Sequence, residues 1–429
     1  MKIYVETLGC KVNQFESQAM EALLRQKGHE IVLSPEGCDG VILNSCAVTA
    51  ESERKSRQAL RRLMGEAPEA VYAVCGCWTQ LRPEAGEALG AHVVAGSCGH
   101  ETLISDLEAA YAEKKKTLHH DEALKRRVFE PLPAGRLEGR TRALLKIQDG
   151  CSNFCTYCVI PYTRGPSRSL PPEACAEGAK AIAEQGVQEI VITGIEVASY
   201  GRDLRPKCTL ADAVEAVAKA APEARLRLGS LEPRVVTEEF CRRLAALPGI
   251  CPHFHLSLQS GCDATLQRMH RRYTAREFYD AAELLRKYFP GCAIGADLIT
   301  GFPGETEEEF SATLAFLEKV NFSFLHVFPY SQRPGTPADS MPGQVPKAEK
   351  KARAQRAIAV AEKLTRRYLE AQVGKTLSVL LETEKDGLWQ GHGKNYCEVA
   401  VKGQGARNLV ANVQIIGVKN GKLDGIILL

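Results

Sequence analysis

Short apolar runs rich in β-branched residues alternate with amphipathic stretches through the first quarter of the chain. The amphipathic stretches repeat their apolar positions every three or four residues, as helices do, at residues 14–27, 50–64 and 101–112. The apolar runs indicate buried parallel strands at residues 3–5, 30–33, 41–43, 71–74 and 92–94. This alternation predicts a doubly wound α/β domain over residues 1–112.

A polar segment at residues 113–142, broken by Pro131, Pro133 and Gly135, interrupts the pattern and predicts a linker. Strand and helix signals then alternate again. Six further strands are predicted, at residues 143–147, 189–193, 225–228, 254–258, 292–299 and 324–327. Six such units indicate a partial (βα)6 barrel over residues 143–368, with its functional groups at the carboxyl ends of the strands.

The pattern of predicted elements changes again near the C-terminus. A long helix predicted at residues 347–371 carries eight basic and three acidic residues, which suits either a solvated surface or a face turned to nucleic acid. Short strands separated by Gly-rich turns follow, at residues 376–381, 388–390, 398–401 and 409–416. They predict a small β-barrel over residues 369–429, of the kind that binds RNA by shape. The chain as a whole is expected to be an α/β protein.

The amino-acid composition limits the classes of protein to which this chain can belong. An apolar content of 45% with 25% charged residues is ordinary for a soluble globular protein, and 429 residues suffice for two or three domains. No apolar run approaches the length of a membrane span, and no secretory signal opens the chain, so we expect a cytoplasmic protein without a membrane partner. Sixteen cysteines in a reducing compartment favour metal ligation over disulfides.

Three cysteines lie close together at the entrance to the predicted barrel. Cys151, Cys155 and Cys158 are spaced C-x3-C-x2-C, and no fourth cysteine follows before Cys175. A cubane iron–sulfur cluster takes four thiolates, so three would leave one iron open to chelate a substrate. A zinc loop is the alternative, but zinc sites usually add a second C-x2-C pair or histidines in register, which this stretch lacks.

A second set of cysteines follows predicted strands of the N-terminal domain. Cys10, Cys46 and Cys77 each come just after a strand, and parallel strands end at one edge of their sheet. Each alone could be a small buried apolar residue, but three at one edge predict a second cluster with three ligands. Cys75 competes with Cys77 for this role; because Cys75 falls inside the strand, we choose Cys77.

The C-x3-C-x2-C spacing resembles the signature of the radical S-adenosylmethionine (SAM) enzymes. The resemblance implies that the open iron is chelated by the amino and carboxylate groups of SAM. An injected electron then cleaves SAM to a 5′-deoxyadenosyl radical.

The two cysteine sets together resemble the methylthiotransferases over almost the whole chain, the C-terminal barrel being TRAM-like. The stretch Thr7-Leu-Gly-Cys-Lys-Val-Asn-Gln-Phe-Glu-Ser17 is similar to the branch that modifies threonylcarbamoyladenosine in tRNA, and residues 151–169 fit the same branch. The branch acting on isopentenylated adenosine usually has Gln-Met-Asn after the first cysteine, and the branch acting on a ribosomal protein has Pro-Lys-Asn. Cys75 departs from the family pattern.

This resemblance implies a methylthio group added to C2 of N6-threonylcarbamoyladenosine beside the anticodon. It implies two 4Fe-4S clusters, and SAM as both methyl donor and radical source. The expected partners are a tRNA anticodon stem-loop, an external electron donor and a sulfur source. Isopentenylated adenosine, a ribosomal protein substrate and a non-enzymatic iron–sulfur carrier remain as alternatives.

Candidate SAM-binding residues lie at the ends of predicted barrel strands and in the cysteine loop. Glu232 could accept hydrogen bonds from ribose hydroxyls, and Ser230 and Gln259 could orient the amino acid part, although strand-end polar groups also serve as helix caps. The candidates are Tyr157, Gly194, Glu196, Ser230, Glu232 and Gln259. Basic stretches at residues 51–64 and around Arg268 and Arg271 suit phosphate attraction or a solvated surface equally.

Overall fold

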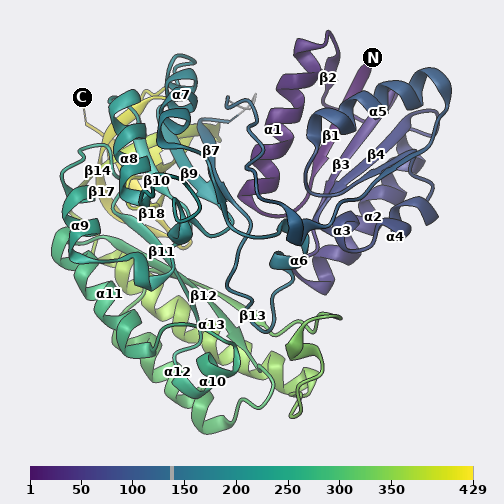
Figure 1. Ribbon diagram of the computed structural model, residues 1–429. Coiled ribbons are helices and arrows are strands. Elements are labelled where there is room, and N and C mark those ends of the chain that lie inside the picture. The colour runs from purple at the N-terminus through teal and green to yellow at the C-terminus, as the bar shows by residue number, and fades with distance from the viewer. Residues whose placement is uncertain (136–139, 429) are drawn as a thin grey trace.

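The N-terminal domain is built on a six-stranded parallel sheet (Figure 1). In the computed structural model, which describes residues 1–135 and 140–428, the strand order is β2-β1-β3-β4-β5-β6. The order reverses direction between β1 and β3, and ligands of open α/β sheets gather at such a switch point. The strands are β1 (Lys2–Thr7), β2 (Glu30–Val32), β3 (Gly40–Ser45), β4 (Val71–Gly76), β5 (Val93–Ala95) and β6 (Thr117–His119).

Helices cover both faces of this sheet, which confirms the predicted doubly wound architecture. Successive strand residues point to opposite faces, so Ile42 packs with α1 (Lys11–Gln26) and α5 (His100–Glu113), while Val41 and Leu43 pack with the other helices. Those helices are α2 (Ala50–Glu66), α3 (Cys77–Leu81) and α4 (Pro83–Ala88).

The segment predicted to be a linker contributes a strand to the N-terminal sheet. β6 lies within residues 113–142 and pairs in parallel with β5, with Thr117 opposite Val93. The strand has only three residues, flanked by lysines and histidines, which is too short for an alternating pattern to be recognised. The N-terminal sheet therefore extends beyond residue 112, and the exact division into domains remains a prediction.

The central part of the chain forms the predicted partial barrel. One sheet has the order β10-β9-β7-β8 and the other β11-β12-β13. Isolated bridges from Leu226 to Ile250 and from Leu231 to Leu256 join the two sheets between β10 and β11. The strands are β7 (Arg142–Asp149), β8 (Arg168–Ser169), β9 (Glu189–Gly194), β10 (Arg225–Leu228), β11 (His253–Gln259), β12 (Ala293–Thr300) and β13 (Phe324–Pro329).

Helices surround the outside of these strands. Thr209, Thr274 and Thr306 each form a capping box that fixes the start of α8, α11 and α12 by satisfying amide groups of the first turn. The helices of this part are α6 (Ile160–Arg164), α7 (Pro172–Ala183), α8 (Leu210–Ala220), α9 (Glu238–Ala245), α10 (Asp263–Arg268), α11 (Ala275–Tyr288) and α12 (Glu307–Val320).

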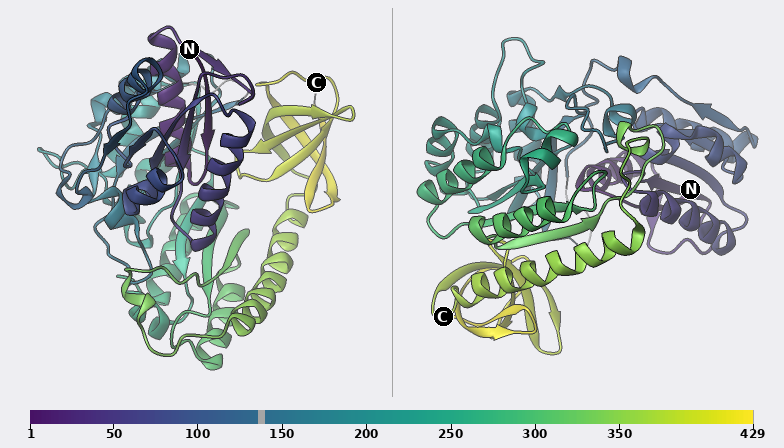
Figure 2. Two further views of the ribbon diagram at one scale, coloured as in Figure 1. Left: turned by 90° about the vertical axis from the view of Figure 1, so that its right-hand side faces the viewer. Right: turned by 90° about the horizontal axis from the view of Figure 1, so that it is seen from below.

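A long helix, α13 (Lys347–Glu370), leads to a closed five-stranded barrel that projects from its end (Figure 2). The predicted small β-barrel is confirmed, with a last strand beyond the predicted ranges. The strands are β14 (Thr376–Lys385), β15 (Leu388–Gly393), β16 (Glu398–Lys402), β17 (Val410–Lys419) and β18 (Lys422–Ile427). Within residues 1–135 and 140–428, no helix combines the length and the apolar character that crossing a bilayer requires.

Buried charges attach the C-terminal barrel to the partial barrel. Glu189, on β9, accepts hydrogen bonds from Arg227 at 2.7 Å and forms an ion pair with Arg225 at 2.8 Å. Arg227 also donates to the backbone carbonyls of Gly393 and Lys394, at 3.3 and 2.9 Å. One buried carboxylate therefore orients two guanidinium groups, and one of these holds the loop between β15 and β16.

Replacing Glu189 with glutamine should lower the free energy of unfolding by about 3–5 kcal/mol, because two buried guanidiniums lose their counter-charge. Denaturant titration of the full chain measures this change. The control is Glu184→Gln, because Glu184 is exposed and its pair with Lys180 at 4.0 Å lies on the surface. Equal stability of the two variants would contradict the importance of this buried pair.

Candidate active site

The three N-terminal cysteines meet at the carboxyl edge of adjacent strands. Cys10 caps the start of α1, Cys46 follows β3 and Cys77 is the first residue of α3 after β4. Gly9 has φ of +108°, and a Cβ there would lie 3.0 Å from the Sγ atom of Cys46. Glycine therefore permits the backbone just before Cys10 to approach Cys46 closely. All three thiols are free.

Cys75 and Cys77 lie in different surroundings. Cys75 is 1% exposed and packs with Ile3 and Met20 in the apolar core beneath α1. The Sγ atom of Cys77 accepts a hydrogen bond from the Nε–H of Arg164 at 3.4 Å. This arrangement supports Cys77, rather than Cys75, as the third cysteine of the set.

The second cysteine set lies on a loop between β7 and α6 that the backbone holds at several points. The amide of Cys151 donates to the carbonyl of Gly165 at 2.9 Å, and that of Cys158 to the carbonyl of Cys155 at 2.9 Å. Gly150 has φ of +72°, and a Cβ there would lie 2.1 Å from the carbonyl oxygen of Pro166. A side chain at position 150 would therefore displace the loop.

Arg271 stands beside this loop. Its Nη1 donates to the Sγ atom of Cys155 at 3.2 Å, and its guanidinium lies 4.8 Å from the centre of the Tyr273 ring. Arg268 is engaged as well, donating to Glu309 at 3.0 Å. These two arginines thus bind protein groups, so a role for them in attracting RNA phosphates is not supported.

Burial affects the ionisation of these thiols. It raises the pKa of Cys158 to about 12, and the neighbouring Cys155 charge adds to this effect. A thiol with such a pKa is protonated at neutral pH. Metal binding must displace that proton, because the thiolate is the ligand.

The two cysteine sets lie on either side of the junction between the N-terminal domain and the partial barrel. α6, directly after Cys158, lies beside α3, which begins with Cys77 (Figure 1). Ser97 donates to the carbonyl of Thr163 at 2.6 Å and fastens α6 to the N-terminal domain. The two cysteine sets are therefore carried by elements that contact each other across the junction.

Thiols are the donors that iron–sulfur clusters take, and both cysteine sets consist of thiols. A single ion needs its ligands to converge on one point. Among the residues that the structure describes, no group of three His, Cys, Asp or Glu side chains does so. A cubane presents a separate iron to each thiolate, so its cysteines surround a volume instead. Each set of three free thiols suits such a cluster and leaves one iron without a cysteine.

Two candidate SAM residues lie at the end of β9. A Cβ on Gly194 would be 2.8 Å from the carbonyl oxygen of Gln148, so glycine allows β9 to run close to β7. The amide of Glu196 donates to the Oε1 of Gln148 at 2.7 Å. Burial, with a smaller effect from the charge of Glu232, raises the pKa of Glu196 to about 7.

The other four candidates differ in their surroundings. Glu232 is buried and accepts a hydrogen bond from Arg234 at 2.8 Å. Gln259 ends β11 with φ of +66°, and Ser230 is exposed. The Tyr157 ring packs edge-on against Phe302, with 6.4 Å between ring centres. Packing explains the position of Tyr157, and a role for any of the four in binding SAM remains a prediction.

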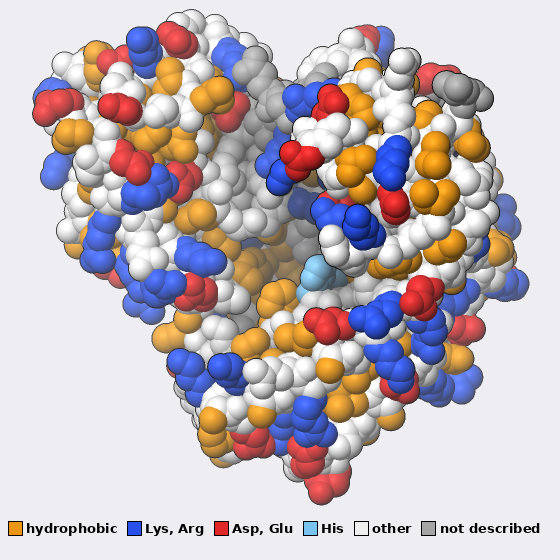
Figure 3. Space-filling model, turned by 180° about the vertical axis from the view of Figure 1, so that it is seen from behind, with side chains coloured by type: hydrophobic (Ala, Val, Ile, Leu, Met, Phe, Trp, Pro, Cys, Tyr) orange, Lys and Arg blue, Asp and Glu red, His pale blue; other side chains and the backbone are white. Residues whose placement is uncertain are grey.

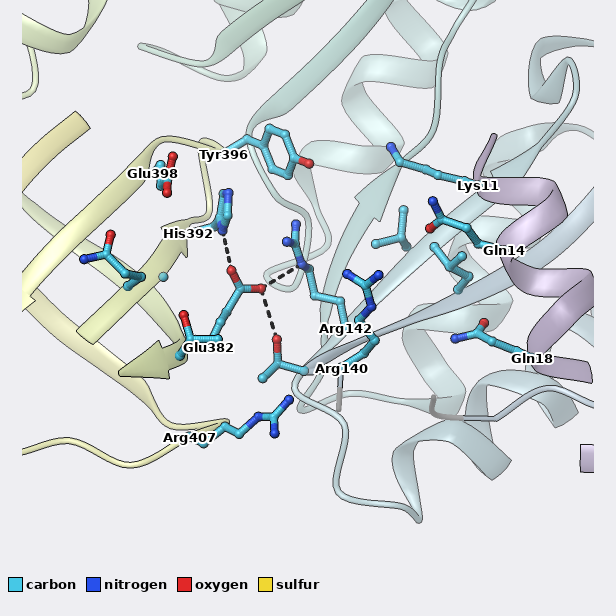
Figure 4. A pocket seen from close by; sticks show the side chains of 16 residues that line it. Lys11, Gln14, Gln18, Arg140, Arg142, Glu382, His392, Tyr396, Glu398 and Arg407 are labelled. Atoms are coloured by element: carbon cyan, nitrogen blue, oxygen red, sulfur yellow. Dashed lines mark hydrogen bonds and ion pairs between the residues drawn. The ribbon is translucent and has the colours of Figure 1, made fainter. Parts of the chain in front are cut away.

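A cavity of about 420 Å³ with several charged side chains in its lining lies between α1, the start of β7 and the C-terminal barrel (Figure 4). Lys11, directly after Cys10, lines it from one side and Tyr396 from the other. The surface seen from behind is hollowed between the domains, with Lys and Arg side chains along the rim (Figure 3). Lys11, the residue after Cys10, thus lines the cavity, whereas none of the three cysteines does.

Charged groups dominate the lining of this cavity. Its cations and carboxylates are Lys11, Arg140, Arg142, Arg407, Glu382 and Glu398. Glu382 accepts hydrogen bonds from Thr141 and His392 and pairs with Arg142 at 3.0 Å. Although burial opposes ionisation, the hydrogen bond from His392 and the charge of Arg142 lower the pKa of Glu382 to about 2. Cations exceed anions here, so the cavity suits an anionic ligand.

The sequence interpretation missed a buried polar network behind the cysteines. Asn13 and Glu16 lie on the inward face of α1, both with at most 1% exposure, and both bind Arg164. Lys146 on β7 donates to Glu16 at 3.0 Å. The detectable signal was two polar residues, three positions apart, on the apolar face of a predicted helix.

The partial barrel and the three-cysteine loop define a radical SAM protein. The family model for the Radical SAM superfamily matches residues 145–317, and that described as Uncharacterized protein family UPF0004 matches residues 2–96. Among solved structures, the radical S-adenosylmethionine methyltransferase TsrM from Kitasatospora setae aligns with a TM-score of 0.56 over 79% of this chain and 77% of that chain. At 15% identity, this likeness shows the fold alone.

Curated relatives narrow the assignment further. "Threonylcarbamoyladenosine tRNA methylthiotransferase MtaB" of Bacillus subtilis is 37% identical over 92% of this chain and 89% of its own length. The protein of the same name in Thermotoga maritima is 35% identical, over 99% and 96%. "tRNA-2-methylthio-N(6)-dimethylallyladenosine synthase" of Pelotomaculum thermopropionicum is 33% identical, over 99% and 96%. The chain belongs to the methylthiotransferase family of radical SAM enzymes, and 4Fe-4S clusters and SAM are its cofactors.

Proposed function

We propose that this enzyme adds a methylthio group to C2 of N6-threonylcarbamoyladenosine beside the anticodon of tRNA. The observation that carries the proposal is the meeting of two three-thiol sets at one domain junction, next to a cationic cavity. Cys151, Cys155 and Cys158 would hold the cluster that binds SAM. Cys10, Cys46 and Cys77 would hold the second cluster. The expected partners are an external electron donor and a sulfur source, in a cytoplasmic setting.

The chemistry of the target explains why such cofactors are needed. The C2–H bond of adenine offers no acidic proton, so a side-chain base has nothing to remove. When bound, SAM and the clusters supply a hydrogen-abstracting radical and the methylated sulfur. The residues of the chain would hold and orient these cofactors. Arg271 donates a hydrogen bond to the sulfur of Cys155, and Arg164 donates one to the sulfur of Cys77. The domain junction would keep both cysteine sets near one substrate.

The cavity favours threonylcarbamoyladenosine over isopentenylated adenosine. A threonylcarbamoyl group ends in a carboxylate, whereas an isopentenyl group is an apolar hydrocarbon. Lys11 and three arginines line the cavity, and its apolar side chains are few. Lys11 also stands in the stretch after the first cysteine that distinguishes the branches of the family. A carboxylate would gain charge-assisted hydrogen bonds from these side chains, which a hydrocarbon cannot accept.

Mass spectrometry of tRNA nucleosides from a strain lacking this gene tests the proposal. We expect the 2-methylthio form of threonylcarbamoyladenosine to disappear and the unmodified form to accumulate, with recovery when the gene is restored. Loss of methylthiolated isopentenyladenosine instead would identify the other RNA substrate. Unchanged tRNA nucleosides would overturn the proposal in favour of a protein substrate or a carrier.

Lys11→Ala should weaken binding of the anticodon stem-loop about tenfold, the effect of losing one charge-assisted contact of about 1.4 kcal/mol. The slope of log affinity against log salt should become shallower by about one if the partner is a phosphate, and by less if it is the threonylcarbamoyl carboxylate. Fluorescence anisotropy with labelled stem-loop measures both. Lys27→Ala is the control, since Lys27 follows α1 at its far end and pairs with Glu108. Equal affinities for the two variants would exclude the cavity as an RNA contact.

A further inference from the structure

The side chain of Arg164, which follows the first strand of the partial barrel, contacts residues of the N-terminal domain beside its cysteine set. Arg164 is the last residue of α6, six positions after Cys158, and its side chain has no exposed surface. Its Nη1 and Nη2 donate to Glu16, and Nη2 also donates to the Oδ1 of Asn13 at 2.8 Å. The third nitrogen, Nε, donates to the Sγ atom of Cys77 at 3.4 Å.

Asn13 extends this contact to a second cysteine. Its Nδ2 donates to the carbonyls of Leu8 and Ser45, both at 3.0 Å, which fixes the orientation of the amide group. The opposite atom, Oδ1, therefore accepts, and the Sγ atom of Cys10 lies 3.5 Å from it. Arg164 thus contacts one cysteine of the set directly and another through a single amide.

Arg164 lies in a network of buried charges. Three cations, Lys146, Arg164 and Arg168, share two carboxylates, Glu16 and Asp149. A third carboxylate, Glu130, contacts His100 at 2.9 Å and also interacts with Lys146. The sulfur of Cys77 lies at the edge of this network, 3.4 Å from the Nε atom of Arg164.

We propose that Arg164 is a positioning residue that donates a hydrogen bond to the sulfur of Cys77 and raises the reduction potential of the cluster that Cys10, Cys46 and Cys77 would hold. A positive hydrogen-bond donor at a ligand sulfur stabilises the reduced state, which carries one more negative charge. The inference rests on the proposed assignment of Cys77 as a ligand. It adds that a residue six positions after the radical SAM motif sets the properties of the other cluster.

Arg168 provides an internal comparison for this proposal. It is 3% exposed and lies 3.6 Å from Asp149, so it belongs to the same buried network. Its Nη1 donates to the carbonyls of Arg164 and Pro166, at 2.8 and 2.7 Å. Because these partners are backbone carbonyls, removing its charge should not act on a ligand sulfur directly.

The test is a redox titration of the full-length chain with Cys151, Cys155 and Cys158 replaced by alanine, which leaves only the second cluster. Dithionite supplies one electron per cluster, and electron paramagnetic resonance follows the reduced form. Arg164→Gln should lower the equilibrium constant for reduction at least about tenfold, which is about 59 mV for a one-electron couple. Arg168→Gln should leave the potential unchanged, and Arg164→Lys should give an intermediate value.

Each outcome bears on the proposal. An unchanged potential in Arg164→Gln, or an equal shift in Arg168→Gln, would overturn it. Should Arg164→Gln bind no iron, Arg164→Lys decides by the same titration: a lowered potential supports the role and an unchanged one refutes it. A triple-alanine background without iron would refute the ligand assignment itself, and the inference with it. The tRNA nucleoside measurement does not depend on any of these results.

Discussion

Replacing Cys155 with alanine is expected to abolish formation of 5′-deoxyadenosine from SAM. Cys155 lies in the middle of the three-cysteine loop and is the cysteine that Arg271 contacts. Losing one of three thiolates should destabilise the whole cluster. The rate should fall by more than about a hundredfold. Even the loss of a residue that only hydrogen-bonds to a metal ligand lowers metal affinity or activity about 10–100-fold, and Cys155 is a proposed ligand itself. Chromatography of anaerobic reactions with reconstituted, reduced protein measures the product.

The matched control is Cys262→Ala. Cys262 is partly exposed and precedes α10, away from both cysteine sets in the sequence. This variant should form 5′-deoxyadenosine at the rate of the unsubstituted chain. If Cys155→Ala still cleaves SAM at that rate, the assignment of the SAM-binding cluster is wrong.

Cys46→Ala should separate the two halves of the reaction. Cys46 is 5% exposed and lies beside Gly9 at the edge of the N-terminal sheet, so its loss removes a ligand from the second set only. The variant should still form 5′-deoxyadenosine but should yield no methylthiolated stem-loop. Its iron content should fall from about eight to about four atoms per chain. Full methylthiolation by this variant would remove the second cluster from the mechanism.

Cys75 and Cys77 give this experiment an internal comparison. Cys77→Ala should behave as Cys46→Ala does, because Cys77 is the proposed ligand. Cys75→Ala should retain methylthiolation, with a modest loss of stability from the small cavity left in the core beneath α1. The opposite result for the pair would reassign the ligand to Cys75.

The architecture could be predicted because its signals are local. Parallel strands buried on both faces leave continuous apolar runs, and helices between them leave a 3.6-residue period, so β1, β3 and β4 were recognisable. Cysteines that directly follow such strands must share an edge, which placed Cys10, Cys46 and Cys77 together. β6 escaped recognition because three residues beside a charged segment produce no period.

Contacts between distant parts of the chain could not be predicted in this way. Arg164 and Glu16 are 148 positions apart, and nothing in either stretch indicates that they bind. Arg271 is a similar case, since a basic residue in a basic stretch suits RNA as well as it suits a thiolate. Its contact with Cys155 depends on the closure of the barrel, which sequence periodicity does not describe.

The central claim is that two separate sets of three cysteines each hold one cluster. Iron and acid-labile sulfide analysis of anaerobically prepared protein tests it most directly, using the unsubstituted chain and two triple-alanine variants, one for each set. The predicted result is about eight iron atoms for the unsubstituted chain and about four for each variant. About four irons in the unsubstituted chain, or iron that one triple replacement leaves unchanged, would contradict the account.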